Sequence, residues 1–336
     1  MDCIYCIQMA NVLKSKAMEK TMKYIIIGIL MAMLGLSACS PYYHLTPMES
    51  MSKDLQYPFE VKYAELSDDV KLSYFDESQG KETIIFVHGL GTYLRAWEKN
   101  IEELKSDYRV IAVDLPGYGK SSKNPHEGSM TYYASVIVEL MDKLNIQSAV
   151  LTGHSMGGQI SMVTALQYPT RVKKLVLVAP AGFERFSEGQ KDWFRDVMTL
   201  TGVKLTPADA VVTNAAYNFY NMPDYAEFII TDRLAMRAAD DFDNYCYTVV
   251  RSVHGMVDQP VIDKLDQIKQ PTLILFGEND NLIPNRYLNP GFTKEIAEYG
   301  HSKIPNSELV MVPQCGHFLP LEKPDVLNEN VRNFLK

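Results

Sequence analysis

The hydrophobic pattern from residue 61 onward alternates short apolar, β-branched runs with stretches whose apolar residues recur at helical spacing. Two early runs, residues 61–66 and 70–75, flank Ser67-Asp68-Asp69, which predicts an antiparallel hairpin at a sheet edge. Later runs are nearly free of polar residues, as in strands buried on both faces. They cover residues 83–87, 110–113, 149–152, 174–178, 272–276 and 309–312. Intervening helices are predicted at residues 94–104, 132–144, 157–167 and 326–334. The pattern predicts an α/β fold, with a mostly parallel eight-stranded sheet flanked by helices.

The alternation stops over residues 181–270, where aromatic and methionine residues recur at helix-like spacings without a convincing strand. This stretch predicts a helical cap inserted over the carboxyl edge of the sheet. It divides the core into residues 59–180 and 271–336. We expect most of the cap's aromatic side chains to form its own core and a minority to line a substrate pocket.

The N-terminus has the pattern of a secretory signal. Lys20 and Lys23 precede an uninterrupted apolar run, residues 24–36, and small residues follow it. The run is shorter than the roughly 20 residues of a membrane span. Residues 36–39, Leu-Ser-Ala-Cys, resemble a bacterial lipobox, which implies a signal peptide over residues 1–38 and lipidation of Cys39.

Two alternatives stay open for this segment: an uncleaved membrane anchor, and a translation start at Met22 in place of Met1. Both the lipoprotein and the uncleaved anchor place the protein at a membrane. The lipobox predicts the cell envelope, on the periplasmic or outer-membrane side. Residues 39–58, polar and without periodicity, are predicted to be a tether.

Composition excludes several classes of function. With 46% hydrophobic and 22% charged residues the chain is an ordinary globular protein, and its formal net charge of -8 argues against a nucleic-acid partner. No four Cys and His residues have zinc-ligand spacing, so we expect neither metal nor cofactor. Cys246 and Cys315 could form a disulfide after export. The narrow geometry that a disulfide requires favours free, buried thiols.

The segment Gly153-His154-Ser155-Met156-Gly157 carries the strongest chemical signal. It is a G-x-S-x-G motif between a predicted strand and a predicted helix, which is the context of a nucleophile elbow. Glycines at 153 and 157 remove side chains that would clash in so sharp a turn. Ser155 is therefore the candidate nucleophile.

A serine hydroxyl needs a base that a third group holds in one tautomer. Asp280 follows the strand predicted at residues 272–276, and His317 follows the one at 309–312. Ser, Asp, His is the chain order of such hydrolases. Glu278 is the competing candidate for the acid.

Two backbone N–H groups are candidates for an oxyanion hole: that of Met156, after the nucleophile, and that of Leu90, in the turn after the strand at residues 83–87. His88, in the same turn, is expected to brace it and not to transfer protons.

Over residues 60–336 the chain resembles the alpha/beta-hydrolase superfamily, in the capped branch of meta-cleavage-product hydrolases, epoxide hydrolases and haloperoxidase-like esterases. The residues that carry the resemblance are His88-Gly89-Leu90-Gly91, Trp97, residues 113–122, 153–158 and 276–284, Gly316-His317-Phe318 and Glu322-Lys323-Pro324. The resemblance implies an α/β-hydrolase fold and a structural role for Asp114. Ser155 replaces the aspartate nucleophile of epoxide hydrolases and haloalkane dehalogenases, which argues against both activities. Residues 285–307 are long for this family and are expected to alter the pocket rim.

These features predict a serine hydrolase acting by acyl transfer, with a small or medium hydrophobic carboxylic ester as its substrate. One alternative is a carbon–carbon bond hydrolase of the meta-cleavage-product type, which uses the same three residues. The other is a membrane-tethered binding protein without catalysis, in which loss of a triad residue is expected. The sequence retains all three.

Overall fold

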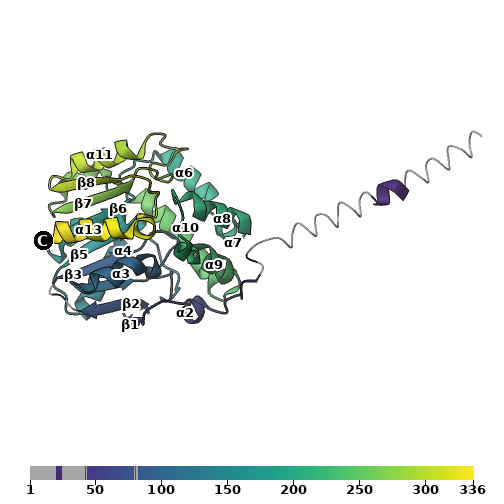
Figure 1. Cartoon of the computed structure of the whole chain (residues 1–336), viewed down its shortest axis with the longest axis horizontal. Helices are drawn as coiled ribbons and strands as arrows, with labels where there is room; N and C mark the ends of the chain where they lie inside the picture. The colour runs from purple at the N-terminus through teal and green to yellow at the C-terminus, as the bar shows by residue number, and fades with distance from the viewer. Residues whose placement is uncertain (1–19, 25–41, 43, 79, 81) are drawn as a thin grey trace, which may run out of the picture. The chain divides into compact units, whose positions relative to one another are not determined.

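The computed structural model describes residues 20–24, 42, 44–78, 80 and 82–336 (Figure 1). Of the predicted signal peptide only residues 20–24 are described, and they are helical. Cys39 lies outside the described residues. The chain divides into two units, Met1–Thr46 and Pro47–Lys336, and the sheet, the cap and the candidate catalytic residues all belong to the second. Within the described residues, no helix has both the length and the apolar character needed to cross a membrane.

The core is one eight-stranded sheet of order β1-β2-β4-β3-β5-β6-β7-β8. Its strands are β1 (Lys62–Glu65), β2 (Lys71–Ser78), β3 (Thr83–Val87), β4 (Arg109–Val113), β5 (Ala149–His154), β6 (Val172–Val178), β7 (Thr272–Gly277) and β8 (Ser307–Val312). The pairs β1/β2 and β2/β4 are antiparallel, and all other pairs are parallel. The α/β-hydrolase fold and its mostly parallel sheet are thus confirmed.

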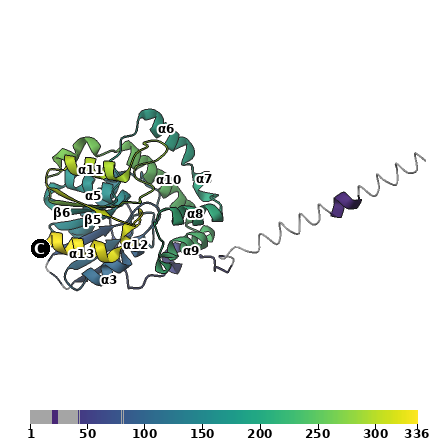
Figure 2. The same cartoon turned by 45° about the horizontal axis from the view of Figure 1, so that its top comes forward.

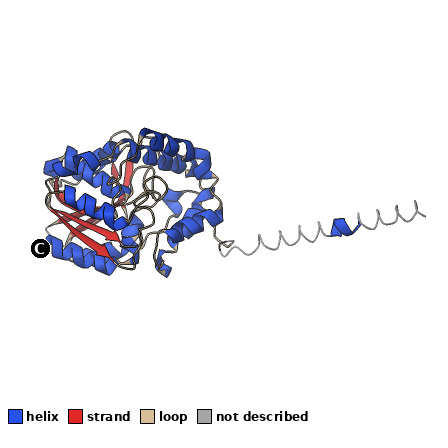
Figure 3. Ribbon diagram, turned by 90° about the horizontal axis from the view of Figure 1, so that it is seen from above, coloured by secondary structure: helices blue, strands red, loops and turns tan. Residues whose placement is uncertain are grey.

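Helices cover both faces of this sheet, as Figure 3 shows from above. The apolar strand residues divide by period two: Ile84 and Phe86 of β3 belong to one core, and Ile85 and Val87 to the other. The first core packs on α3 (Glu98–Leu104), α12 (Leu319–Glu322) and α13 (Pro324–Leu335), and includes residues of the 3₁₀ helix η1 (Leu94–Trp97). The second packs on α4 (Met130–Lys143), α5 (Met156–Gln167) and α11 (Thr293–Lys303). Burial on both faces explains why the central strands lack polar residues.

The predicted cap is helical, and no strand occurs among its residues, all of which are described. It comprises α6 (Glu188–Val197), α7 (Leu200–Lys204), α8 (Ala208–Tyr217), α9 (Phe228–Ala235) and α10 (Phe242–Asp258), with 3₁₀ helices η3 (Asp224–Ala226), η4 (Met236–Ala238) and η5 (Ile262–Gln267). Helices α6 to α10 gather at one end of the sheet, and the C-terminus lies at the other (Figures 1 and 2). Phe228, Phe242 and Tyr245 are buried, whereas Trp193 and Tyr220 are exposed. The cap's aromatic residues therefore only partly form its core.

The long segment after Asp280 has two parts. Its first part contacts the start of the cap: Glu184 accepts hydrogen bonds from the backbone N–H of Asn285 (2.7 Å) and from Nδ2 of Asn289 (3.1 Å). Its second part is α11, which packs against β7 and β8. The helix that the hydrophobic pattern missed is therefore an ordinary layer of the core, and only the first part lies beside the cap.

The predicted tether over residues 39–58 is wrong for its second half. Met51 and Leu55 are fully buried, in the short helix α2 (Met51–Asp54) and directly after it. Met48 N–H donates to the carbonyl of Ala235 in the cap (3.1 Å), and the Tyr57 hydroxyl donates to Asp114 in the core (2.7 Å). Residues 47–58 are thus part of the folded domain.

Candidate active site

The turn between β5 and α5 holds Ser155 in a strained conformation. Its φ of 53° and ψ of -117° are rare for a residue with a side chain. Neighbouring backbone fixes this conformation: Ser155 N–H donates to the carbonyl of Val178 (3.0 Å), and its own carbonyl accepts from Ala181 N–H (3.0 Å). A Cβ on Gly157 would lie 2.1 Å from the carbonyl oxygen of Val87, so the turn requires glycine there.

Ser155 is also the one residue between Ala149 and Ala165 that is not buried. Its neighbours in the turn, His154 and Met156, are 2% and 0% exposed. The strained turn therefore presents this single side chain at the carboxyl edge of the sheet. That is the arrangement that a nucleophile elbow requires.

A buried carboxylate–imidazole pair lies at the ends of β7 and β8. Nδ1 of His317 is 2.7 Å from Oδ2 of Asp280. The other oxygen of Asp280, Oδ1, accepts from the backbone N–H groups of Leu282 (2.8 Å) and Ile283 (3.1 Å). Because both carboxylate oxygens have donors, the carboxylate is held in one orientation. Glu278, the competing candidate, is exposed.

His154 connects the serine turn to this pair. Its ring centroid lies 4.8 Å from that of His317, and its Nε2 donates to the His317 carbonyl (2.9 Å). Burial, and after it the nearby His317, hold the pKa of His154 well below its ordinary value. The ring is therefore neutral and adds no charge beside His317. The structure thus brings Ser155, Asp280 and His317 to the same edge of the sheet, with the Ser155 turn joined to His317 through His154.

The turn that carries Leu90 is fixed by three donors to one oxygen. The Gly89 carbonyl accepts from Nδ1 of His88 (2.8 Å), from Oγ1 of Thr92 (3.0 Å) and from the Thr92 N–H (3.4 Å). This carbonyl and the Leu90 N–H belong to one planar trans peptide and point in opposite directions. The donors therefore fix the direction of the Leu90 N–H. The turn lies against the nucleophile, because a Cβ on Gly89 would be 3.1 Å from Cβ of Ser155.

The second candidate donor, the Met156 N–H, opens α5 and so has no acceptor within the helix. His88 has no free nitrogen for proton transfer, since its Nε2 accepts from Leu115 N–H (3.0 Å). Burial lowers the pKa of His88 to about 4. The structure thus shows His88 bracing the turn, as expected. Asp114 is likewise structural, with its oxygens accepting from Leu94 N–H, Lys120 N–H and the Tyr57 hydroxyl.

The cap is bonded to the loops that carry these residues. The Tyr245 hydroxyl of α10 donates to the Gly91 carbonyl (3.0 Å). Glu322 accepts from Gly316 N–H (2.7 Å), beside His317, and from Tyr220 N–H of the cap (3.1 Å). Sequence reasoning missed the positioning roles of Thr92 and Glu322. Glu322 stood within a recognised motif, whereas nothing in the sequence distinguished Thr92.

Cys246 and Cys315 are free and buried, as expected. Burial raises the pKa of the Cys246 thiol to about 11, so it is not a second nucleophile at neutral pH. The described residues contain no cluster of three or more His, Cys, Asp or Glu side chains that could hold a metal ion.

A sheet of this order, with a strained serine turn after β5 and a helical cap, defines an α/β hydrolase. Comparison with known proteins agrees with this class. The sequence model of the family described as "alpha/beta hydrolase fold" matches residues 82–324. The 2-hydroxy-6-oxononadienedioate/2-hydroxy-6-oxononatrienedioate hydrolase 1 of Pseudomonas putida is 30% identical over 291 residues, which cover 82% of this chain and 96% of that protein.

Two solved structures share the fold. A probable hydrolytic enzyme from Pseudomonas aeruginosa PAO1 has a TM-score of 0.77 and 25% identity, and the match covers 87% of this chain and 99% of that one. An esterase from Exiguobacterium antarcticum has a TM-score of 0.69 and 24% identity, with 82% and 99% covered. The chain therefore belongs to the alpha/beta hydrolase family and is a hydrolase.

Proposed function

We propose that this protein is a serine hydrolase that acts by acyl transfer through Ser155, His317 and Asp280. The observation that carries the proposal is the buried Asp280–His317 pair, 2.7 Å apart, at the edge where the strained turn presents Ser155. A carboxylate on Nδ1 fixes the tautomer in which Nε2 of the imidazole is free to accept a proton.

In this mechanism Nε2 of His317 takes the proton of the Ser155 hydroxyl as Oγ attacks the substrate carbonyl. The N–H groups of Leu90 and Met156 donate to the oxyanion that forms. His317 then gives the proton to the leaving group. A water molecule, deprotonated by the same imidazole, releases the acyl group from Ser155. Asp280 stabilises the imidazolium at both steps.

The first candidate substrate is a hydrophobic carboxylic ester, because the cap over the site is rich in aromatic and methionine residues. Hydrolysis of p-nitrophenyl esters of increasing acyl length by the full chain, in a non-ionic detergent, tests it. Ser155→Ala should abolish turnover. Ser135→Ala, which removes an exposed hydroxyl on α4, should leave turnover unchanged. Equal turnover by Ser155→Ala and the parent protein would rule out Ser155 as the nucleophile.

The second candidate is carbon–carbon bond hydrolysis of a carboxylate-bearing substrate, and Arg233 favours it. Arg233 is a half-buried residue that forms no ion pair with any described residue. Its guanidinium donates to Sδ of Met236 (3.9 Å), and its Cζ lies 4.7 Å from the ring centroid of Tyr245. Tyr245 in turn contacts Gly91, beside Leu90. A half-buried cation without a counter-ion favours an anionic ligand. The Pseudomonas putida relative is named for a dicarboxylate substrate.

Arg233→Met separates the two candidates. On a 2-hydroxy-6-oxo-dienoate the variant should raise KM at least about tenfold, the effect expected when a charge-assisted hydrogen bond is lost. On a neutral ester KM should not change. Arg237→Met, an exposed position that likewise forms no ion pair with a described residue, is the matched control. No turnover of the dienoate by the parent enzyme would eliminate this candidate.

We also propose that Cys39 is lipidated and holds the enzyme at the cell envelope. The support is the lipobox-like sequence at residues 36–39. In bacterial cells fed an azide-bearing fatty acid, the parent and a Cys6→Ala control should become labelled, and Cys39→Ala should not. Label retained by Cys39→Ala would refute the anchor.

A further inference from the structure

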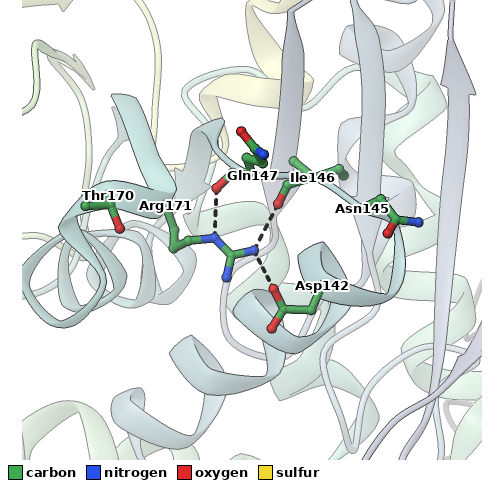
Figure 4. Close-up of a pocket in the computed structure, with 6 residues that line it drawn as sticks. All are labelled: Asp142, Asn145, Ile146, Gln147, Thr170 and Arg171. Carbon is green, nitrogen blue, oxygen red and sulfur yellow. Dashed lines mark hydrogen bonds and ion pairs between the residues drawn. The ribbon is translucent and has the colours of Figure 1, made fainter.

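Two surface depressions lie away from the candidate active site, and they differ in what their cations do. The first is lined by Asp142 near the end of α4, by residues 145–147 before β5, and by Thr170 and Arg171 just before β6 (Figure 4). Its one cation, Arg171, donates to the carbonyls of Gln147 (2.8 Å) and Ile146 (2.9 Å) and pairs with Asp142 (2.7 Å). The guanidinium of Arg171 is therefore already bound to groups of the protein itself.

The second depression, of about 520 Å³, is where four segments meet. It is lined by Ser50 and Ser52 at the start of α2, Tyr63 and Lys71 of the edge hairpin, residues 120–124 after β4, and Asp241 and Asn244 at the start of α10. Three lysines line it, against one carboxylate. We call it the lysine pocket.

One lysine and the carboxylate form its inner wall. Lys123 is buried; its Nζ donates to the carbonyls of Gly119 (2.8 Å) and Ser121 (3.0 Å) and lies 3.4 Å from Asp241. Asp241 also accepts from the Met51 N–H (3.1 Å). This pair is a structural joint between the cap, the core and residues 47–58, and its charges cancel.

The other two lysines of the lining differ from Lys123 in their contacts. Lys71 and Lys120 form no ion pair with any described residue, and each lies over an aromatic ring. Nζ of Lys71 is 4.5 Å from the ring centroid of Tyr63, and Nζ of Lys120 is 5.0 Å from that of Tyr57. The rings restrict both side chains without neutralising them. Asp54 of α2, which does not line the pocket, interacts electrostatically with Lys120. The lining itself thus carries two lysine charges that no lining carboxylate pairs with.

Neutral donors accompany these charges. The Ser122 hydroxyl accepts from the Lys71 N–H (3.1 Å) and donates to no described residue, so its own proton is available to a ligand. Asn244 is exposed and adds an amide donor from α10. Ammonium, hydroxyl and amide groups from separate segments suit a tetrahedral oxyanion, which accepts hydrogen bonds from several directions.

We propose that the lysine pocket binds a phosphate group. A general attraction for anions does not account for such a site, because residues 39–336 carry 29 Lys and Arg against 39 Asp and Glu, after subtraction of four basic and two acidic residues in 1–38. The phosphate could be a free ion or the diester of a lipid headgroup. Ser50 is only 11 residues from Cys39, a span of at most about 40 Å, so a lipidated chain would keep the pocket near the bilayer.

Calorimetric titration of the full chain, in a non-ionic detergent, tests this proposal with two probes. Inorganic phosphate represents the free ion, and glycerophosphoglycerol represents a lipid headgroup without its acyl chains. Saturable binding of either probe is expected. Lys71→Gln/Lys120→Gln should weaken it at least about tenfold, since two charge-assisted hydrogen bonds are lost. Lys264→Gln/Lys269→Gln, which removes the same charge from exposed positions outside the pocket, should not.

Some outcomes distinguish the two sources of the phosphate, and others overturn the proposed site. Tighter binding of inorganic phosphate supports a free ion, and tighter binding of the diester supports a lipid headgroup. Absence of saturable binding by both probes overturns the site. So does binding that both double variants weaken equally, since the effect would then be one of net charge. Ester hydrolysis by each variant should match the parent, which keeps this test independent of the proposed activity.

Discussion

Replacement of Asp280 by Asn tests the role of the carboxylate, because the structure dictates how the amide must lie. The backbone N–H groups of Leu282 and Ile283 both point at Oδ1. The amide oxygen must occupy that place, since an NH₂ group there would face two donors. The NH₂ group then faces Nδ1 of His317, where it can only donate.

The imidazole is thereby forced into the wrong tautomer. With Nδ1 accepting from the introduced amide, the ring proton moves to Nε2 of His317. In the proposed mechanism this nitrogen takes the proton of Ser155, and a protonated Nε2 cannot do so. A substitution of this kind costs about 10⁴-fold in kcat, or about 5 kcal/mol in the activation free energy. KM for a p-nitrophenyl ester should change little, because the substitution leaves the shape of the substrate site unaltered.

The assay is steady-state hydrolysis of the best p-nitrophenyl ester by the parent, Asp280→Asn and Glu278→Gln. The exposed Glu278 is the matched control, two residues away, and its variant should retain parental kcat. Thermal unfolding of each variant checks that the fold is intact. If Asp280→Asn keeps kcat within tenfold, or if Glu278→Gln is the variant that loses it, the assignment of the acid is wrong.

Three further predictions concern the surroundings of the site. Thr92→Val removes one donor to the Gly89 carbonyl, whose peptide fixes the direction of the Leu90 N–H. We expect kcat to fall about 10- to 100-fold with KM unchanged, which is less than the full effect of losing an oxyanion donor. The control Thr206→Val, which removes a similar hydroxyl-to-carbonyl bond in the cap, should not lower kcat. Met51→Ala should lower the unfolding free energy measured in urea by about 2–5 kcal/mol, because Met51 is fully buried. Met22→Ala, at an exposed position, should lower it by almost nothing. Equal unfolding free energies for the two variants would mean that residues 47–58 are a tether after all. Burial lowers the pKa of His88 from 6.5 to about 4, so the neutral ring's contribution to stability is complete above pH 6.5 and is lost as the pH falls toward 4, by up to about 3 kcal/mol. In urea unfolding from pH 7 to 4.5, the unfolding free energy of His88→Gln should therefore depend less on pH than that of the parent. An identical pH dependence of the two proteins would refute this role.

The positions of the central strands could be predicted because their signal is local. Burial on both faces requires an unbroken apolar run, and β3 is found at the predicted residues 83–87. The serine turn was likewise local, since Gly153 and Gly157 are demanded by contacts within the strand–turn–helix unit and with the adjacent strand. Helix α11 was missed because its one buried stripe, with Ala297 and Gly300, is too weakly apolar to stand out.

The docking of residues 47–58 could not be predicted for a different reason. Helix α2 has four residues, too few to show a period. The partners of Met48 and Met51, which are Ala235 and Asp241, are about 190 residues away in the chain. A short segment whose hydrogen-bond partners lie far away in the chain has no local pattern that distinguishes it from a free tether.

Sequence alone was enough to establish the fold class, the order of Ser155, Asp280 and His317, and the strand ends on which they lie, because these follow from short-range patterning and from glycine sterics. Which carboxylate faces the imidazole became clear only in the folded molecule. Backbone bonds of the turn after β7, from Glu278 N–H to Val312 and from Asn279 N–H to Cys315, leave Glu278 exposed and bury Asp280 against His317. Those bonds join segments that lie more than 30 residues apart in the chain, so no local sequence pattern could predict them.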